Sequence, residues 1–269
     1  MQTQTFSHMN HTTRWRVLQR APSVFAEAPH TSRSERYAYV PTIRLIEGLA
    51  DHGWYPTQAS EQRARNVGRR GFTKHLVRLQ NDTLPRVADT APQILLLNSH
   101  DGTSTYQMRA GFYRFVCSNG LVVGEDILPA MRVKHTGDAI REIIEGSYRI
   151  IEEVPALLGS IEGMAGLQLA DGERRAFARA AMALRFEGVS APVTEDQVMR
   201  PRRHEDEKPD LWTTFNVVEE NLIKGGLRGR DANSRRRRTR GIVGIDGNVA
   251  LNQALWTLAE EMRKLKLAA

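Results

Sequence analysis

The sequence has a single cysteine and no long apolar run, and each shortage excludes a class of protein. One thiol, Cys117, cannot close an internal disulfide or supply a thiolate metal cage. No segment approaches the roughly 18 apolar residues of a membrane span, and no short apolar core follows a basic start, so we expect neither membrane insertion nor secretion. These absences predict a cytoplasmic protein in which Cys117 is a small buried hydrophobe.

The usual catalytic and metal-binding patterns are also missing. The eight histidines are scattered singly, without the i, i+4 pair that a helix can offer to a metal. Residues 99–101 are Ser-His-Asp, but consecutive side chains do not converge into a triad, so we expect a turn. A nuclease would have to gather carboxylates such as Asp126, Asp138 and Glu142 around divalent ions. The sequence therefore predicts no catalytic residue, no cofactor and no metal site.

Basic residues are in excess, with 38 Lys and Arg against 31 Asp and Glu and a formal net charge of +7. This balance favours an anionic partner, because basic side chains gain affinity by displacing counterions from phosphates. The charge is concentrated in two segments, each of which is either a phosphate-binding surface or a solvated loop. The first segment, residues 62–81, has no acidic residue and contains Arg63, Arg65, Arg69, Arg70, Lys74 and Arg78. The second segment is the run Arg235, Arg236, Arg237 and Arg238.

Hydrophobic periodicity predicts an α+β core over residues 37–155, after a polar N-terminal arm over residues 1–36. Thr42 as N-cap, followed by apolar residues at helical spacing, predicts a short helix that ends near Gly53. A basic hairpin is predicted next, with strands over 57–67 and 74–80 and a connection at 68–71. Later strands are predicted at 94–98, within 106–123 (as a strand and a helix, or as a strand broken at Gly111), and at 131–135.

The second half, residues 156–269, is predicted to be mainly helical. Before it, at the end of the α+β core, an apolar stripe from Ile140 to Val154 that includes Tyr148 predicts a helix. This helix would begin near Asp138, whose carboxylate would cap it. Residues 198–210 are predicted to be an exposed loop, and residues 224–240 a flexible basic segment. The remaining helices are predicted at 173–186, 211–223 and 249–265. The predicted fold class is thus α+β, an antiparallel β-sheet with flanking helices followed by a mainly helical C-terminal half.

Three strings resemble the phage and plasmid proteins grouped as domain of unknown function 932. They are Phe-Val-Cys-Ser-Asn-Gly-Leu-Val-Val at 115–123, His-Thr-Gly-Asp at 135–138, and the segment 248–261. The likeness covers most of the chain. It implies a setting on mobile genetic elements, among replication, recombination and anti-defence functions.

The order of helix, basic hairpin, strand and helix between Ile43 and Tyr148 is similar to the core of Rad-type single-strand annealing proteins, most of all at His52-Gly-Trp54. This similarity implies single-strand binding in a positively charged groove and assembly into a homo-oligomeric ring or filament. The basic residues between Arg63 and Arg78 would then contact phosphates. Trp54 or Tyr55 would offer a stacking face, worth about 1–3 kcal/mol per base.

We therefore predict a non-catalytic nucleic-acid-binding protein of a mobile genetic element, whose partner is single-stranded DNA. Two alternatives stay open. One is a protein-interaction role, as an inhibitor of a host defence protein or a regulator of plasmid establishment, and the other is a metal-dependent nuclease. An annealer binds naked single strands and oligomerises, an inhibitor co-purifies with a host protein, and a nuclease cleaves until its metal is chelated.

Overall fold

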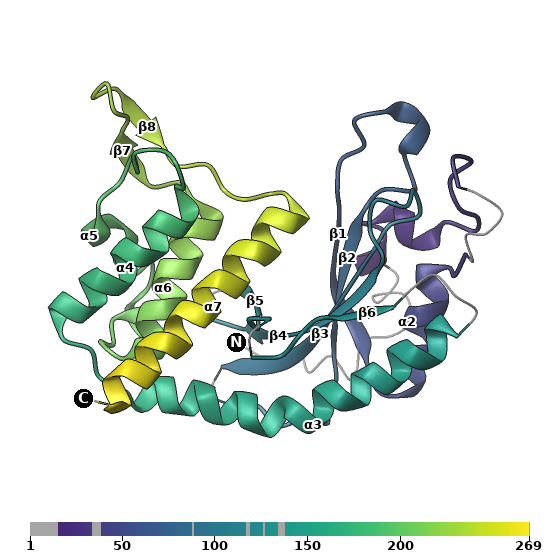
Figure 1. Cartoon of the computed structure of the whole chain (residues 1–269), viewed down its shortest axis with the longest axis horizontal. Helices are drawn as coiled ribbons and strands as arrows, with labels where there is room; N and C mark the ends of the chain where they lie inside the picture. The colour runs from purple at the N-terminus through teal and green to yellow at the C-terminus, as the bar shows by residue number, and fades with distance from the viewer. Residues whose placement is uncertain are drawn as a thin grey trace. The chain divides into compact units, whose positions relative to one another are not determined.

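The structure, a computed structural model, describes residues 16–33, 39–87, 89–116, 119–125, 127–133 and 138–268 (Figure 1). The predictions for Cys117, Asp126 and His135 lie outside these residues, as does part of the N-terminal arm. The chain forms two compact units, and it passes between them at both ends of residues 122–127 and again within helix α3 (Ala139–Gly166). The first unit comprises Met1–Leu121 and Leu128–Val154, and the second comprises Val122–Ile127 and Pro155–Ala269.

An antiparallel sheet forms the centre of the first unit, with strand order β1-β2-β3-β4-β5 and with β6 paired to β4. β1 and β2 form the predicted hairpin, and residues 62–74 connect them. The predicted α+β class is therefore confirmed. The strands are β1 (Tyr55–Glu61), β2 (His75–Gln80), β3 (Thr90–Asn98), β4 (Tyr106–Arg114), β5 (Asn119–Val122) and β6 (Met131–Val133).

Every residue of β2 and β3 is buried, which means that both faces of the sheet are covered at these strands. β3 begins earlier than predicted and contains Pro92. β4 runs through Gly111 without a break. A Cβ atom at Gly111 would lie 2.4 Å from Leu95 Cδ1 and 2.5 Å from the Leu121 carbonyl oxygen, so the absence of a side chain lets the backbone of β5 approach β4.

Two helices pack on this sheet, and both differ in detail from the prediction. α2 (Thr42–Asp51) is present, but its N-cap is Pro41 rather than Thr42. In α3, Ile140 and Tyr148 are exposed, whereas Ile143, Ile150 and Val154 are buried. The predicted apolar stripe was therefore partly wrong. The face of the helix that is buried includes Ile143, Ile150 and Val154 but not Ile140 or Tyr148.

The Thr42 hydroxyl does not cap α2 but belongs to a buried polar network. Nδ1 of His75 donates to the Thr73 carbonyl at 2.9 Å, so Nε2 of a neutral ring accepts from the Thr42 hydroxyl at 2.8 Å. Oγ1 of Thr42 in turn accepts from Nδ2 of Asn98 at 2.9 Å and from Nε2 of His100 at 3.2 Å. The predicted turn at 99–101 is thus fixed to α2 and β2 from within the core.

The neutral state of His75 makes the fold sensitive to acid. Burial lowers the pKa of His75 from 6.5 to about 4, against the opposing effects of the hydrogen bond to Thr73 and the charge of Asp101. Because the folded pKa lies below the unfolded one, the stabilisation is complete above pH 6.5 and is lost as the pH falls from there toward 4. We expect the free energy of unfolding to be about 3 kcal/mol lower at the acid end of this window than above pH 6.5.

Equilibrium urea titrations at several pH values measure this loss. A His75→Gln variant is the control, since its amide can still hydrogen-bond to Thr73 and Thr42 but cannot titrate. The variant should show a flatter stability profile over the same window. An equally steep profile in the variant would assign the acid sensitivity to other groups.

The described part of the N-terminal segment is packed rather than extended. Leu18, Ala21 and Val24 are buried, the last two at and within the 3₁₀ helix η2 (Pro22–Phe25). The Ser23 amide donates to the Glu61 carboxylate at 2.8 Å. Residues 16–33 are therefore not a wholly polar arm, because Leu18, Ala21, Ser23 and Val24 are buried within the first unit.

The second unit is helical, as predicted, apart from one small sheet. In its core Trp212 stacks on Phe215, and Trp256 meets both rings edge to face, with ring centroids 5.5–6.1 Å apart. Among the helices of the described ranges, none is long and apolar enough to cross a membrane. The elements are the later part of α3, α4 (Asp171–Arg185), α5 (Glu195–Val198), the 3₁₀ helix η4 (His204–Asp206), α6 (Leu211–Lys224), β7 (Arg228–Arg230), β8 (Arg236–Arg238) and α7 (Ile245–Ala268).

Residues 198–210 are not simply the exposed loop that was predicted. Asp206 is buried, and its carboxylate pairs with Arg203 at 2.6 Å. Arg203 also donates to both carboxylate oxygens of Glu220, at 2.7 and 2.8 Å. Glu220 is 3% exposed. This ion-pair network holds the segment against α6. Asp206 is only three residues from Arg203, but Glu220 is 17 residues away, too far for a local pattern to reveal it.

Candidate nucleic-acid interface

Residues 62–74 form a basic loop that joins β1 to β2 beyond the end of the sheet (Figure 1). Arg63, Arg65, Arg69 and Arg70 are exposed along it, and Lys74 is half-buried. The loop contains one 3₁₀ turn, η3 (Val67–Arg69), in which the Asn66 side chain accepts the Gly68 amide at 2.9 Å. The connection is longer than the predicted 68–71, because β1 ends at Glu61; Arg63 and Arg65, which were predicted on a strand, lie on the loop with Arg69 and Arg70.

One side of the basic loop is attached to the turn after β3. The Phe72 carbonyl accepts the amides of His100 and Asp101, at 2.9 and 3.1 Å. Asp101 also pairs with Arg69 at 3.6 Å. Burial raises the pKa of Asp101, but hydrogen bonds from Thr103 and Ser99 and the charge of Arg69 outweigh it, so the pKa lies below its usual range. Arg63, Arg65 and Arg70 have no ion-pair partner in the ranges that the structure describes.

Two residues predicted to contact nucleic acid do not reach the surface. Arg78 is 4% exposed, and its guanidinium donates to the carbonyls of Gly120 and Leu121 at 2.7 and 3.2 Å. Trp54 is fully buried, which leaves no ring face for a base to stack on. Tyr55 is half-buried at the start of β1. The basic surface of the first unit is therefore smaller than the sequence suggested, because β2 is covered on both faces.

The second basic segment forms an arginine ribbon, which we define as residues 228–240. Its strands β7 and β8 pair antiparallel, with Arg228 opposite Arg238, Gly229 opposite Arg237 and Arg230 opposite Arg236. The ribbon contains seven arginines and one acid, Asp231. It was predicted to be a flexible connection, whereas the structure gives it a defined register.

The turn of the ribbon is organised by Asp231. Oδ1 of Asp231 accepts the amides of Asn233 and Arg235, each at 3.0 Å. Oδ2 pairs with Arg237 at 2.9 Å, and this hydrogen bond is the main reason that the pKa of Asp231 is lowered. The Asp231 carboxylate thus fixes the turn and neutralises one arginine.

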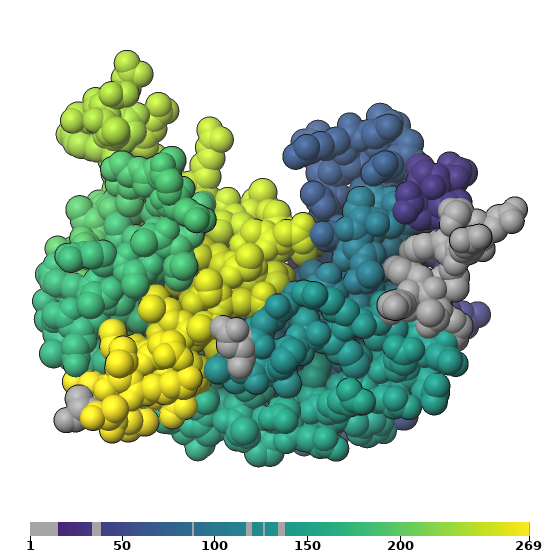
Figure 2. Space-filling model, in the orientation of Figure 1, coloured from purple at the N-terminus to yellow at the C-terminus, as the bar shows by residue number. Residues whose placement is uncertain are grey.

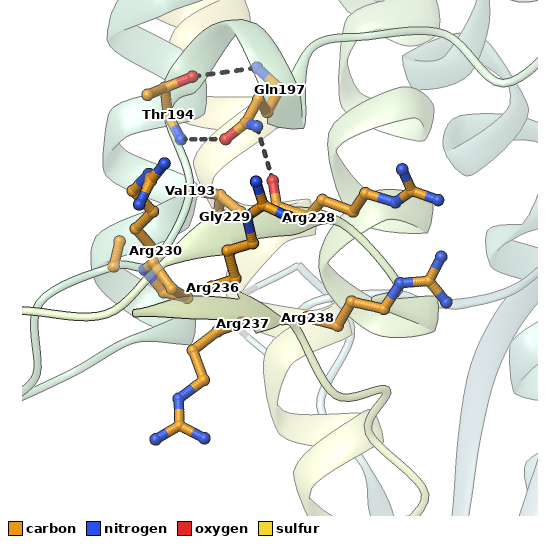
Figure 3. Close-up of a pocket in the computed structure, with 11 residues that line it drawn as sticks. Val193, Thr194, Gln197, Arg228, Gly229, Arg230, Arg236, Arg237 and Arg238 are labelled. Carbon is orange, nitrogen blue, oxygen red and sulfur yellow. Dashed lines mark hydrogen bonds between the residues drawn. The ribbon is translucent and has the colours of Figure 1, made fainter. Parts of the chain in front are cut away.

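The outer edge of β7 is docked on the segment that leads into α5. The Arg230 amide donates to the Pro192 carbonyl at 2.8 Å, and the Gln197 side chain donates to the Arg228 carbonyl at 2.7 Å (Figure 3). A Cβ atom at Gly229 would lie 1.7 Å from the Pro192 carbonyl oxygen, so only glycine allows this approach. The ribbon and residues 191–197 border an open hollow of about 1050 Å³.

The base of the ribbon is joined to α6. Arg202 donates to Oδ1 of Asn221 and to the Gly225 carbonyl, each at 2.7 Å. The Gly226 amide donates to the Thr239 carbonyl at 2.8 Å. Within the second unit the ribbon stands out from the helices as a knob (Figure 2). Its arginines are therefore exposed to a macromolecular partner while the backbone beneath them is fixed.

Neither basic segment is accompanied by a candidate metal centre. Within the described ranges, no three His, Cys, Asp or Glu side chains gather to hold an ion. In the same ranges Asp138, exposed at the start of α3, pairs with Arg141 at 3.6 Å. The sites that the structure assembles are thus arginine surfaces, whose chemistry is the recognition of anions.

Comparison with known proteins places the chain in a family. Residues 29–256 match the family model described as Domain of unknown function (DUF932). UPF0380 protein YafZ and UPF0380 protein YfjQ, both of Escherichia coli (strain K12), are each 46% identical to this chain over 250 residues, which cover 93% of this chain and 91% of each relative. No solved structure matches. With the greater part of its length matched in this way, the chain belongs to the DUF932 family.

Proposed function

We propose that this protein is a non-catalytic nucleic-acid-binding protein of a mobile genetic element, which binds single-stranded DNA and anneals it to its complement. The observation that carries the proposal is the presence of an exposed arginine surface in each of the two units. Arginine guanidinium groups match phosphate geometry through their forked donors. The setting on mobile elements and the oligomeric assembly rest on the resemblances in the sequence alone.

The division of charge between fixed and free arginines supports the proposal. Many exposed arginines elsewhere have an acidic partner, such as Arg44 with Glu47 at 3.1 Å and Arg179 with Glu195 at 2.9 Å. The basic loop and the ribbon leave most of their guanidinium groups without one among the described residues. Surface charges that are not neutralised internally are available to phosphates, which replace the small counterions around them.

Fluorescence anisotropy of a labelled single strand and a matched duplex, each at two salt concentrations, tests the proposal. We expect single-strand binding at about micromolar affinity or better, falling steeply with salt as phosphate contacts are screened. Light scattering on the same sample should show an oligomer, and mixing complementary strands should give faster annealing than in buffer. Absence of binding to either nucleic acid at low salt would overturn the proposal.

The same samples distinguish the alternatives. Inclusion of Mg²⁺ with and without a chelator should leave the strands intact in both cases, whereas chelator-sensitive cleavage would indicate a nuclease. A protein that binds no nucleic acid but retains a host protein through purification would instead be an interaction partner or inhibitor.

A further inference from the structure

The arginine ribbon presents four arginines on a single face. Side chains alternate between the faces of a strand, and directly opposed residues share a face. The pairs Arg228–Arg238 and Arg230–Arg236 therefore lie together, while Gly229 and Arg237 occupy the other face. Figure 3 shows Arg228 and Arg238 extending side by side, and Arg237 extending the opposite way.

This arrangement is unfavourable for an isolated hairpin. Like charges directly opposite each other destabilise a strand pair, and here two such pairs are adjacent. All four side chains are exposed, and no acid within the described residues pairs with them. The ribbon keeps its register through contacts of its backbone and its turn, described above, so the repulsion between the four guanidinium groups is left for a bound polyanion to relieve.

The shape of the ribbon suits one kind of polyanion. Two paired strands are about 4.8 Å apart, and the major groove of B-form DNA, about 12 Å wide, admits a two-stranded ribbon. Side chains from such a ribbon reach the phosphates on both sides of the groove, and arginine also pairs with the O6 and N7 atoms of guanine. The basic loop, by contrast, has no repeating geometry and places its arginines along a single irregular backbone.

From these features we infer that the arginine ribbon is a separate site for duplex DNA, inserted into the major groove through Arg228, Arg230, Arg236 and Arg238, while single strands bind the basic loop. The inference rests on the proposed function and deepens it, since annealing converts single strands into duplex. A protein with both sites can hold the substrate strand and the product duplex at once. The chemical class of the ligand at the ribbon is B-form duplex, because the major groove of A-form RNA is too narrow for side chains to enter.

Two variants that each remove four charges separate the sites. The ribbon variant is R228Q/R230Q/R236Q/R238Q, and the loop variant is R63Q/R65Q/R69Q/R70Q. A matched control, R44Q/R141Q/R175Q/R179Q, removes four exposed arginines that have acidic partners. Thermal melts of all three should lie close to the wild type, because every altered side chain is exposed, and pairs made by exposed side chains contribute little to stability.

Anisotropy provides the readout, with a labelled strand of about 30 nucleotides and its duplex, which is longer than the roughly 4–16 nucleotides of a single-strand binding site. The ribbon variant should lose roughly 100-fold in duplex affinity, with a salt slope smaller by about 3, and should keep single-strand affinity within about fivefold. The loop variant should lose single-strand affinity by a similar factor and keep duplex affinity within about fivefold. The control should change neither affinity by more than about threefold. Wild-type binding to the duplex should fall when bulky glucosyl groups on cytosine fill the major groove, and should be weaker on duplex RNA.

Three outcomes would overturn the inference while leaving the proposed function intact. They are equal losses of single-strand and duplex affinity in the ribbon variant, unchanged duplex affinity in that variant, and indifference of the wild type to a filled major groove. Failure of the wild type to bind either DNA would overturn the proposed function itself.

Discussion

Replacing Arg78 with methionine should lower the free energy of unfolding by about 3 kcal/mol and leave the affinity for DNA of the folded protein nearly unchanged. The guanidinium is the donor to two carbonyls of β5, those of Gly120 and Leu121. A buried carbonyl that loses its donor costs about 1–3 kcal/mol. Gly120 is part of the same contact, since a Cβ atom there would lie 2.3 Å from Cζ of Arg78.

Arg70→Met is the matched control, because Arg70 is exposed on the basic loop of the same unit. It should change stability by less than about 0.5 kcal/mol and reduce the salt slope of single-strand binding by about 0.7, the value of one phosphate contact. Urea unfolding gives the stability of both variants, and anisotropy gives their binding. A stable Arg78→Met protein that binds DNA less well would mean that this guanidinium reaches the ligand after all.

The contrast between Arg78 and Arg70 shows how far the sequence predicts the interface. Both are arginines in one acid-free segment, but Arg78 lies among the apolar residues of a strand, whereas Arg70 lies between Arg69 and Gly71. The two carbonyls that accept from the Arg78 guanidinium belong to β5, which lies some 40 residues away in the sequence. Such a contact has no local signal, so periodicity could place the hairpin correctly and still assign the wrong exposure to one of its residues.

Helices were predicted more reliably than the surfaces they present. α4, α6 and α7 agree with the predicted ranges to within a few residues, since each has a long amphipathic or capped pattern. The ribbon was missed as an ordered element because three-residue strands rich in arginine have no apolar alternation. Gly225, Gly226 and Gly229 were interpreted as flexibility, whereas each glycine meets a geometric requirement of its own.

Gly225→Ala should lower the free energy of unfolding by about 4 kcal/mol. Gly225 ends α6 with φ 62° and ψ −147°, close to a region that is essentially restricted to glycine and costs other residues about 1–3 kcal/mol. A Cβ atom there would also lie 2.7 Å from the Arg240 carbonyl carbon and the Gly241 nitrogen. These are backbone atoms, so the clash can be relieved only by moving the chain, at a further cost of about 1–3 kcal/mol.

Gly159→Ala is the same chemical change as Gly225→Ala, but we expect it to raise stability rather than lower it. Gly159 lies within α3, where an added Cβ meets nothing within 4 Å, so alanine should stabilise the helix by about 0.5–1 kcal/mol. Urea unfolding compares the two variants, and trypsin cleavage at the ribbon arginines reports the local effect. Because the carbonyl of Gly225 accepts Arg202 at 2.7 Å and thereby joins the ribbon to α6, Gly225→Ala should expose the ribbon to trypsin and weaken duplex binding before single-strand binding. Equal stability of the two variants would mean that the end of α6 can adopt another conformation, and the ribbon would then owe its register to Asp231, Pro192 and Gln197 rather than to Gly225.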